Sequence, residues 1–156
     1  MSNGDFKVDT ASWASWWGDV WSGNSTGDVT AENGKMKIHI TSIGTASYAP
    51  QVFQENLNLE NGKTYVVRFT AKADVARRMN VNIGKALTVD PWFTNYATTK
   101  VIDITTTEQQ YTYVFTVTEA TYDNIKLVFE VGNVAGGAAV TDIYLYDISI
   151  QAISDL

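Results

Sequence analysis

The fold class is decided by the stretch Thr64-Tyr65-Val66-Val67-Arg68-Phe69-Thr70-Ala71-Lys72-Ala73. Its odd positions are all apolar, whereas its even positions are mostly polar or charged. A period of two is typical of a β-strand that has one buried face and one face in solvent. The same alternation recurs at residues 35–40, 79–83, 111–117, 125–131 and 140–150. We therefore predict half-buried antiparallel strands along most of the chain.

Turn signals separate these strands. Asn33-Gly34 and Asn61-Gly62 are short turn sequences, and residues 132–137 form a longer glycine-rich turn. No window of about eleven residues keeps a helical spacing of apolar side chains. We predict an all-β fold, a jelly-roll β-sandwich of two antiparallel sheets, with one domain over residues 1–156. The longest interruption between strands is residues 86–100, and long loops on a sandwich often carry function.

Composition narrows the function classes. The 156 residues carry a net charge of −6, and 45% of them are hydrophobic. The negative charge argues against a nucleic-acid partner, and no apolar run reaches the roughly 18 residues of a membrane span. The chain has no cysteine, which excludes disulfides, thiol catalysis and cysteine-ligated zinc. Residues 1–5 lack the features of a signal peptide, so we read the chain as a mature protein or an excised module.

Catalytic patterns are missing from the sequence. His39 is the only histidine and falls on the polar side of its predicted strand, so a histidine-based triad is not credible. A glycan hydrolase with two carboxylates would have to use Glu55 and Glu130, which are the only plausible pair. Nothing specifies those two residues as acid and base. A hydrolase therefore stays the alternative to a binding protein.

The tryptophans are unusually concentrated. Four of the five lie between Trp13 and Trp21, more than a core usually takes from one short segment. We assign Trp13 to the core. Trp16 and Trp17 are adjacent and face opposite sides of an extended chain, so we expect one of them to be an exposed platform. The loop at residues 91–96, with three aromatic residues, is a second candidate platform.

A polar face is predicted on the strands opposite the core. It includes Gln51, Asn80, Asn82, Lys126 and Glu130. These side chains donate and accept several hydrogen bonds, as sugar hydroxyls require, and aromatic rings suit the C–H faces of pyranose rings. An ordinary solvated sheet face would have the same composition. The tryptophan cluster favours sugar binding for the group as a whole.

Asp147 is a candidate metal ligand. In a regular strand its carboxylate would face the core side with Ile143 and Leu145, where it must be paired or bind a metal. Asp5 and carbonyl groups around Gly34 could complete an oxygen site suited to Ca²⁺. A β-bulge that turns Asp147 outward would explain the same sequence.

Five motifs together resemble those of carbohydrate-binding modules of the family 4 type, a group that also includes families 9, 16 and 22. The motifs are Asn3-Gly4-Asp5-Phe6 with Trp13, Glu32-Asn33-Gly34-Lys35-Met36, Gln51-Val52-Phe53-Gln54-Glu55-Asn56, Leu59-Glu60-Asn61-Gly62-Lys63-Thr64-Tyr65, and Tyr144-Leu145-Tyr146-Asp147-Ile148-Ser149-Ile150. The resemblance covers nearly the full chain. The surroundings of Trp16, Trp17, Gln51 and Trp92 look most like modules of bacterial β-1,3-glucanases (laminarinases).

The resemblance implies a non-catalytic module of a secreted, extracellular multidomain glycoside hydrolase, which we expect to be monomeric. Its ligand would be a single β-glucan chain, β-1,3- or mixed-linked, with cellulose oligosaccharides and xylan as alternatives. The module would bind it in an aromatic-walled cleft on a concave face and target the hydrolase to polysaccharide. The resemblance assigns ligand binding to Trp16 or Trp17, Gln51, Asn80, Trp92 or Tyr96, Lys126 and Glu130, beside which we place Asn82. It assigns a structural Ca²⁺ to Asp5, the Gly34 carbonyl and Asp147.

Two positions depart from the family pattern. Several members carry glutamine where this chain has Lys126 and Glu130. The two charges either change the ligand preference or form a salt bridge with each other. A sandwich that uses its tryptophan patch to bind another protein is a further alternative.

Overall fold

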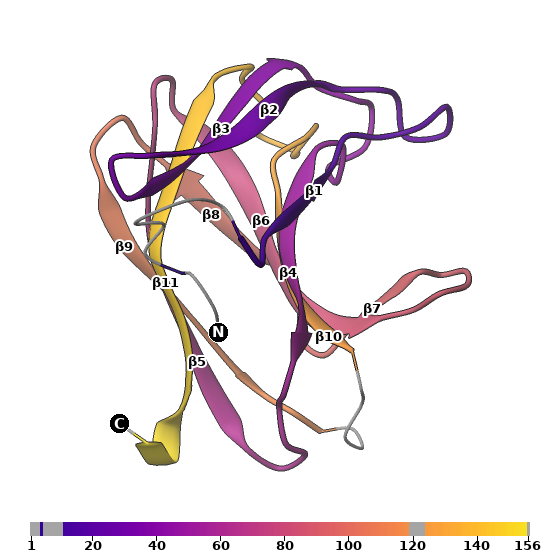
Figure 1. Ribbon diagram of the computed structural model, residues 1–156, viewed down its shortest axis with the longest axis vertical. Helices are drawn as coiled ribbons and strands as arrows, with labels where there is room; N and C mark the ends of the chain where they lie inside the picture. Colours follow the sequence, from indigo (N-terminus) through magenta and orange to yellow (C-terminus); the bar gives the residue numbers. More distant parts are fainter. Residues whose placement is uncertain (1–3, 5–10, 119–123, 156) are drawn as a thin grey trace.

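The computed structural model is an all-β sandwich, as predicted (Figure 1). It describes residue 4 and residues 11–118 and 124–155. Within these residues the chain forms β-strands and a short 3₁₀ helix, η1 (Ile153–Asp155). None of the described residues forms a helix long and apolar enough to cross a membrane.

Two antiparallel sheets form the sandwich, and we call them sheet A and sheet B. Sheet A has the order β1 (Ala14–Trp16), β4 (Gln51–Leu57), β10 (Ile125–Glu130), β6 (Arg77–Ala86), β7 (Phe93–Asn95), with β8 (Lys100–Ile104) also paired to β6. Sheet B has the order β2 (Thr26–Glu32), β3 (Lys35–Ser42), β11 (Asp142–Ala152), β5 (Thr64–Ala73), β9 (Gln109–Thr116). Neighbours in each sheet are mostly distant in sequence, as in a jelly roll.

The core lies between the two sheets. Phe69 of β5 meets Phe129 of β10 edge to face, with ring centroids 5.1 Å apart. Neither ring is exposed to solvent. Trp13 packs against the same cluster, with its ring centroid 6.1 Å from that of Phe129. The structure therefore confirms the core position that the sequence predicts for Trp13.

Strands with a strong alternation lie where the sequence predicts them. The weaker strands β1, β2, β7 and β8 were not predicted. β1 and β7 have three residues each, and β7 lies inside the predicted interruption at residues 86–100. β2 has mostly exposed residues because it is the edge strand of sheet B. For that reason its sequence shows only a weak alternation of apolar and polar residues.

Asp147 lies in a bulge of β11. The register with β5 shifts between Tyr146 and Ser149, and Asp147 has a φ of 51°. The side chain is exposed. Of the two alternatives for this residue, the outward-turning bulge is therefore the one that forms.

A buried arginine joins the β10–β11 loop to β6. Arg77 is only 3% exposed, and its guanidinium donates hydrogen bonds to the carbonyl oxygens of Arg78, Gly132 and Ala139 at 2.8–2.9 Å. Burial lowers the pKa of Arg77 to about 10. The loop is therefore fixed next to the start of β6.

Candidate functional site

The outer face of sheet A, on the side away from sheet B, brings most of the predicted polar residues together. Strand register places Trp16 opposite Gln51, Gln51 opposite Glu130, and Glu130 opposite Asn80. These residues form one row across four strands. Lys126 and Asn82 lie on the same face because they alternate with buried residues of β10 and β6. We call this surface the polar face.

Glu130 and Asn80 are neighbours in this row, on β10 and β6. Glu130 Oε1 accepts hydrogen bonds from Asn80 Nδ2 at 3.1 Å and from Ser47 Oγ at 3.2 Å. Asn80 Oδ1 is buried and has no hydrogen-bond partner among the described residues. A buried acceptor without a partner costs about 1–3 kcal/mol. A donor from a ligand or from water would remove that cost, which is a reason to expect binding at this row.

The other asparagine of the face is covered. Asn82 is 5% exposed, and its Oδ1 accepts a hydrogen bond from Thr99 Oγ1 at 2.6 Å. Thr99 belongs to the segment between β7 and β8. Asn82 is therefore covered by Thr99 and has little exposed surface that a ligand could contact.

Lys126 lies between two aromatic rings instead of pairing with Glu130. Its Nζ is 4.5 Å from the ring centroid of Phe53 and 5.5 Å from that of Phe93. Burial lowers the pKa of Lys126, while the charges of Glu55 and Glu130 act in the opposite direction. Of the two explanations for this departure from the family pattern, the salt bridge does not form. The ammonium and the carboxylate are separate polar groups on the polar face.

The two adjacent tryptophans have different surroundings, as predicted from their opposite orientations. The Trp16 ring lies on the polar face, with its centroid 6.0 Å from that of Tyr48. Tyr48 is 42% exposed and was not predicted as a site residue. Trp17 packs against the core and against Gly27, where an added Cβ would lie 2.9 Å from the indole ring. Trp16 is therefore the platform candidate of the two.

A tight turn presents a tryptophan that the sequence analysis did not select. Asp19 Oδ1 accepts hydrogen bonds from the backbone N–H groups of Trp21 and Ser22, both at 2.9 Å, and from Ser22 Oγ at 3.0 Å. The hydrogen bond from the Ser22 backbone lowers the pKa of Asp19. Thr45 N–H donates to the Ser22 carbonyl at 2.7 Å, which fixes the turn to the β3–β4 loop. The Trp21 ring at its tip is 89% exposed. The signal in the sequence is an aspartate two residues before a tryptophan, the pattern of an Asx turn.

Trp92 is carried by the hairpin between β6 and β7. Leu87 N–H donates to the Trp92 carbonyl and Trp92 N–H donates to the Val89 carbonyl, both at 2.8 Å. The side chain is 60% exposed. Tyr96, the other aromatic candidate here, is half-buried and packs against the core. Trp92 is therefore the platform candidate of this loop.

The two tryptophan-bearing loops project on the same side of the molecule. Figure 1 shows the β1–β2 loop and the β6–β7 hairpin extending to the right, away from strands β5, β9 and β11 of sheet B. The first loop is attached where β4 begins, and the second where β6 ends. The two loops thus flank opposite ends of the polar face, one beside Gln51 and the other beyond Lys85.

The two residues of the hydrolase alternative have well-separated backbone positions along the sheet. Gln51 is opposite Glu130, so Glu55 lies four residues further along β4, about 13 Å at the backbone. Carboxyl groups that act together in glycosidases are roughly 5–9.5 Å apart. Lys126 lies across from Glu55, because Leu127 is opposite Gln54 and Ile125 is opposite Leu57. Glu130 is held by Ser47 and Asn80. This geometry favours binding over hydrolysis.

A hollow of about 880 Å³ opens elsewhere, at the edge of the sandwich between β4 and the end of β11. It is lined by Trp13, Phe53, Glu55, Tyr65 and Gln151 among others. None of Gln51, Asn80, Lys126 or Glu130 is among its lining residues. The chemistry therefore favours the polar face over this hollow.

The candidate calcium ligands are partly within the described residues. Leu145 of β11 is opposite Met36 of β3, and Lys35 Nζ lies 4.8 Å from the ring centroid of Tyr146. Gly34 and Asp147 are the next residues of their segments. Ile148 N–H donates to the Gly4 carbonyl at 3.0 Å. Asp5 lies outside the described residues. Among residues 4, 11–118 and 124–155, no three His, Asp or Glu side chains gather as a metal site.

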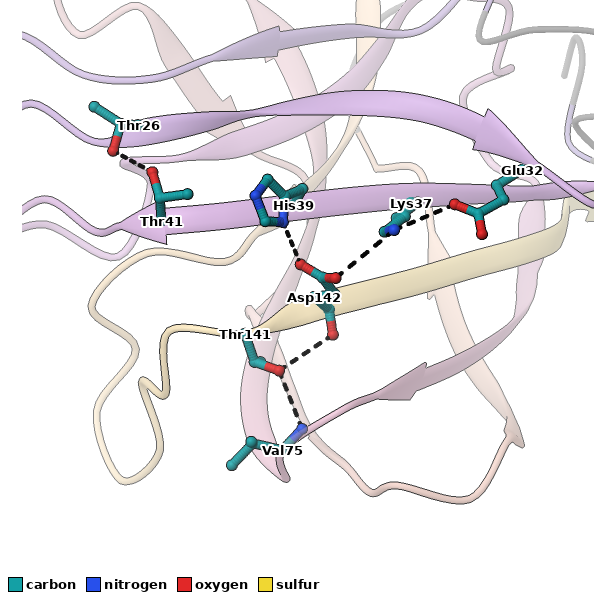
Figure 2. Close-up of polar contacts among 8 residues, drawn as sticks. All are labelled: Thr26, Glu32, Lys37, His39, Thr41, Val75, Thr141 and Asp142. Atoms are coloured by element: carbon teal, nitrogen blue, oxygen red, sulfur yellow. Dashed lines mark hydrogen bonds and ion pairs between the residues drawn. The ribbon is translucent and has the colours of Figure 1, made fainter.

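His39 lies far from the polar face. It is on the outer face of sheet B, where its Nδ1 is 2.6 Å from Asp142 Oδ1 (Figure 2). Lys37 Nζ in the same cluster is 3.2 Å from Glu32 Oε2. The sequence placed His39 on a solvated strand face, and its carboxylate partner was not predicted.

Comparisons with known proteins agree with this architecture. The model of a family described as "Carbohydrate binding domain", CBM_4_9, matches residues 1–138. A search of curated proteins found no match. A structure described as "CBM4 structure and function" is 28% identical, with a TM-score of 0.84, and the match covers 97% of this chain and 98% of that chain.

Two more distant structures share the fold. The N-terminal cellulose-binding domain of Cellulomonas fimi β-1,4-glucanase C is 21% identical, with a TM-score of 0.69, and 97% and 95% of the two chains are covered. The CBM22-1–GH10 modules of Clostridium thermocellum xylanase 10B, complexed with xylohexaose, match at 13% identity and a TM-score of 0.62. That match covers 98% of this chain and 28% of the xylanase chain.

Proposed function

The chain belongs to the carbohydrate-binding domain family CBM_4_9, and from this membership we propose that it binds a single β-glucan chain across the polar face, between Trp21 and Trp92. The observation that carries this proposal is that the loops of two exposed tryptophans lie at opposite ends of the polar face, one beside Gln51 and the other beyond Lys85. We propose a β-1,3- or mixed-linked glucan as the preferred ligand, with cellulose oligosaccharides and xylan as the alternatives.

The chemistry of the face fits a neutral sugar chain. Trp21, Trp92 and Trp16 would stack on pyranose rings, each contributing on the order of 1 kcal/mol beyond the area that it buries. Glu130 and Asn80 would accept hydrogen bonds from hydroxyl groups, and Lys126 would donate to hydroxyl oxygens. After the entropic cost of association, we expect micromolar affinity, roughly −7 to −8 kcal/mol.

We further propose that the domain acts as a targeting module of a secreted, multidomain hydrolase and is monomeric. The xylanase 10B structure supports the first part, because it joins a CBM22-1 module to a GH10 module in one chain. On this proposal the domain holds the attached enzyme at its polysaccharide and takes no part in bond cleavage.

Isothermal titration of the purified domain tests the proposed ligand. We expect heat with laminarihexaose, and less or none with cellohexaose and xylohexaose. Heat with only one of the other two sugars would keep glycan binding and change the linkage. No heat of binding with any of the three sugars, together with capture of another protein, would favour the protein-interaction alternative. Release of reducing sugar by the isolated domain would favour the hydrolase.

A structural Ca²⁺ is the second proposal. Asp147, in the bulge of β11, and the carbonyl of Gly34 in the β2–β3 turn offer the oxygen donors that Ca²⁺ prefers. Asp5 would be a third ligand. The ion would join the β2–β3 turn to β11 and would add stability without touching the polar face.

EDTA should lower the melting temperature of the domain. A ligand at a hundred times its Kd stabilises a fold by about 2.7 kcal/mol, which corresponds to roughly 5–10 °C for a domain of this size. Asp147→Ala should remove this response, whereas Asp142→Asn on the same strand should retain it. Differential scanning calorimetry in metal-free buffer measures both. A melt of the unaltered domain that EDTA leaves unchanged would end the calcium proposal.

A further inference from the structure

The polar face continues past Asn80 to an ion pair between Arg78 and Asp103. Strand register places Arg78 of β6 opposite Asp103 of β8, and Asn80 opposite Val101. Arg78 and Asn80 are two residues apart in one strand, so they point to the same side at a spacing of about 7 Å. Arg78 Nε is 2.9 Å from Asp103 Oδ1.

The β10–β11 loop holds the guanidinium of Arg78 in place. The Arg78 side chain lies against this loop, where a Cβ added to Gly136 would be 2.5 Å from Nη1. Gly136 has a φ of 89°, so a glycine is favoured there for two reasons. Arg78 N–H donates to the Gly137 carbonyl at 2.8 Å. The buried guanidinium of Arg77 fixes the same loop to Gly132 and Ala139. Little conformational entropy is therefore left to lose when Arg78 meets a ligand.

Both members of the pair keep unused hydrogen-bonding capacity. Among the described residues, no hydrogen bond uses Arg78 Nη2 or Asp103 Oδ2. The side chains of Arg78 and Asp103 are 43% and 77% exposed. Beside them, Val101 is 48% exposed and offers an apolar surface next to Asn80. Together the three residues supply a donor, an acceptor and a small apolar platform.

Resting on the proposed function, we propose that Arg78 and Asp103 form an additional subsite, which reads the hydroxyl groups of the sugar that lies over Val101. The guanidinium donates to the hydroxyl oxygens and the carboxylate accepts from the hydroxyl protons. The two charges cancel, so the subsite suits a neutral sugar rather than an acidic one. The subsite adjoins Asn80, because Val101 is its strand partner. A trisaccharide that lies over Lys126 and Glu130, toward Trp92, leaves the subsite empty, whereas a hexasaccharide also covers it.

Chain-length dependence of binding tests the subsite. Titrations use the trisaccharide and the hexasaccharide of whichever glucan the unaltered domain binds. Arg78→Met and Asp103→Asn should each weaken hexasaccharide binding about three- to tenfold and trisaccharide binding less than about twofold. Asp103→Asn nearly conserves shape, so it keeps the test valid if Arg78→Met folds poorly. Hexasaccharide affinity that is unchanged in both variants would overturn the subsite, and so would an equal loss at both lengths.

A matched control comes from the opposite sheet. Lys37 and Glu32 form a comparable ion pair on the outer face of sheet B (Figure 2). Lys37→Met should leave binding of both sugars unchanged. Trp92→Ala in the same titrations separates this inference from the proposed function. If Trp92→Ala weakens binding and Arg78→Met does not, the subsite proposal is wrong and the proposed function stands. If neither weakens binding, the proposed function fails with it.

Discussion

Replacing both Trp21 and Trp92 with alanine should weaken glucan binding by about a hundredfold and leave the fold intact. Each stacking ring is expected to account for about tenfold in affinity, or 1.4 kcal/mol. The two rings lie on separate loops at opposite ends of the polar face, so their effects should be nearly additive. The rings are 89% and 60% exposed. Their removal therefore creates no cavity in the core.

Titration calorimetry on the single and double variants measures this effect, with thermal melts as the test of folding. Tyr144→Ala is the matched control, because Tyr144 is a partly exposed aromatic on the outer face of sheet B. Its removal should change binding less than about twofold. Normal affinity in the double variant would show that the two loops do not contact the ligand. Equal losses of binding and of melting temperature would point to misfolding instead.

Arg77→Met should be the most destabilising of these substitutions. The carbonyl oxygens of Gly132 and Ala139 would lose their donor from Arg77 inside the protein, at about 1–3 kcal/mol each. Methionine fills part of the space and removes the cost of burying a charge, which offsets some of the loss. We expect a net loss of about 3 kcal/mol, or roughly 6–12 °C in melting temperature.

Urea unfolding of the Arg77→Met variant and of the unaltered domain, extrapolated to water, measures this loss in the free energy of unfolding. Arg78→Met is the control next in sequence, and since its ion pair is exposed, it should change stability by less than about 1 kcal/mol. If Arg77→Met unfolds at the same urea concentration as the unaltered domain, water or a rearranged loop must satisfy the two carbonyl groups. The hydrogen bonds from Arg77 would then contribute nothing net to the fold.

The sequence predicts the strands of the core and the side chains of the polar face for one physical reason. A strand alternates its side chains, so buried Val81, Leu127 and Phe129 fix which face their neighbours Asn80 and Glu130 occupy. Gln51 follows from the same rule. That part of the candidate site needs no knowledge of which strands pair.

The loops could not be predicted in the same way. The direction of the Trp21 turn depends on the hydrogen bond from Thr45 to the Ser22 carbonyl, between residues that are far apart in sequence. Asn82 has the right spacing for the polar face, yet Thr99 covers it. Lys126 meets Phe93, which belongs to a strand of three residues with no clear pattern. Each of these outcomes is set by a tertiary contact rather than by local spacing.

The turn at Asp19 satisfies its own hydrogen bonds, and it does so without using the side chain at its tip. The identity of residue 21 is therefore nearly independent of folding. An exchange of this one ring therefore needs no compensating change in the core. For a protein engineer, the same independence makes position 21 a place where a library of side chains can be displayed at little cost in yield.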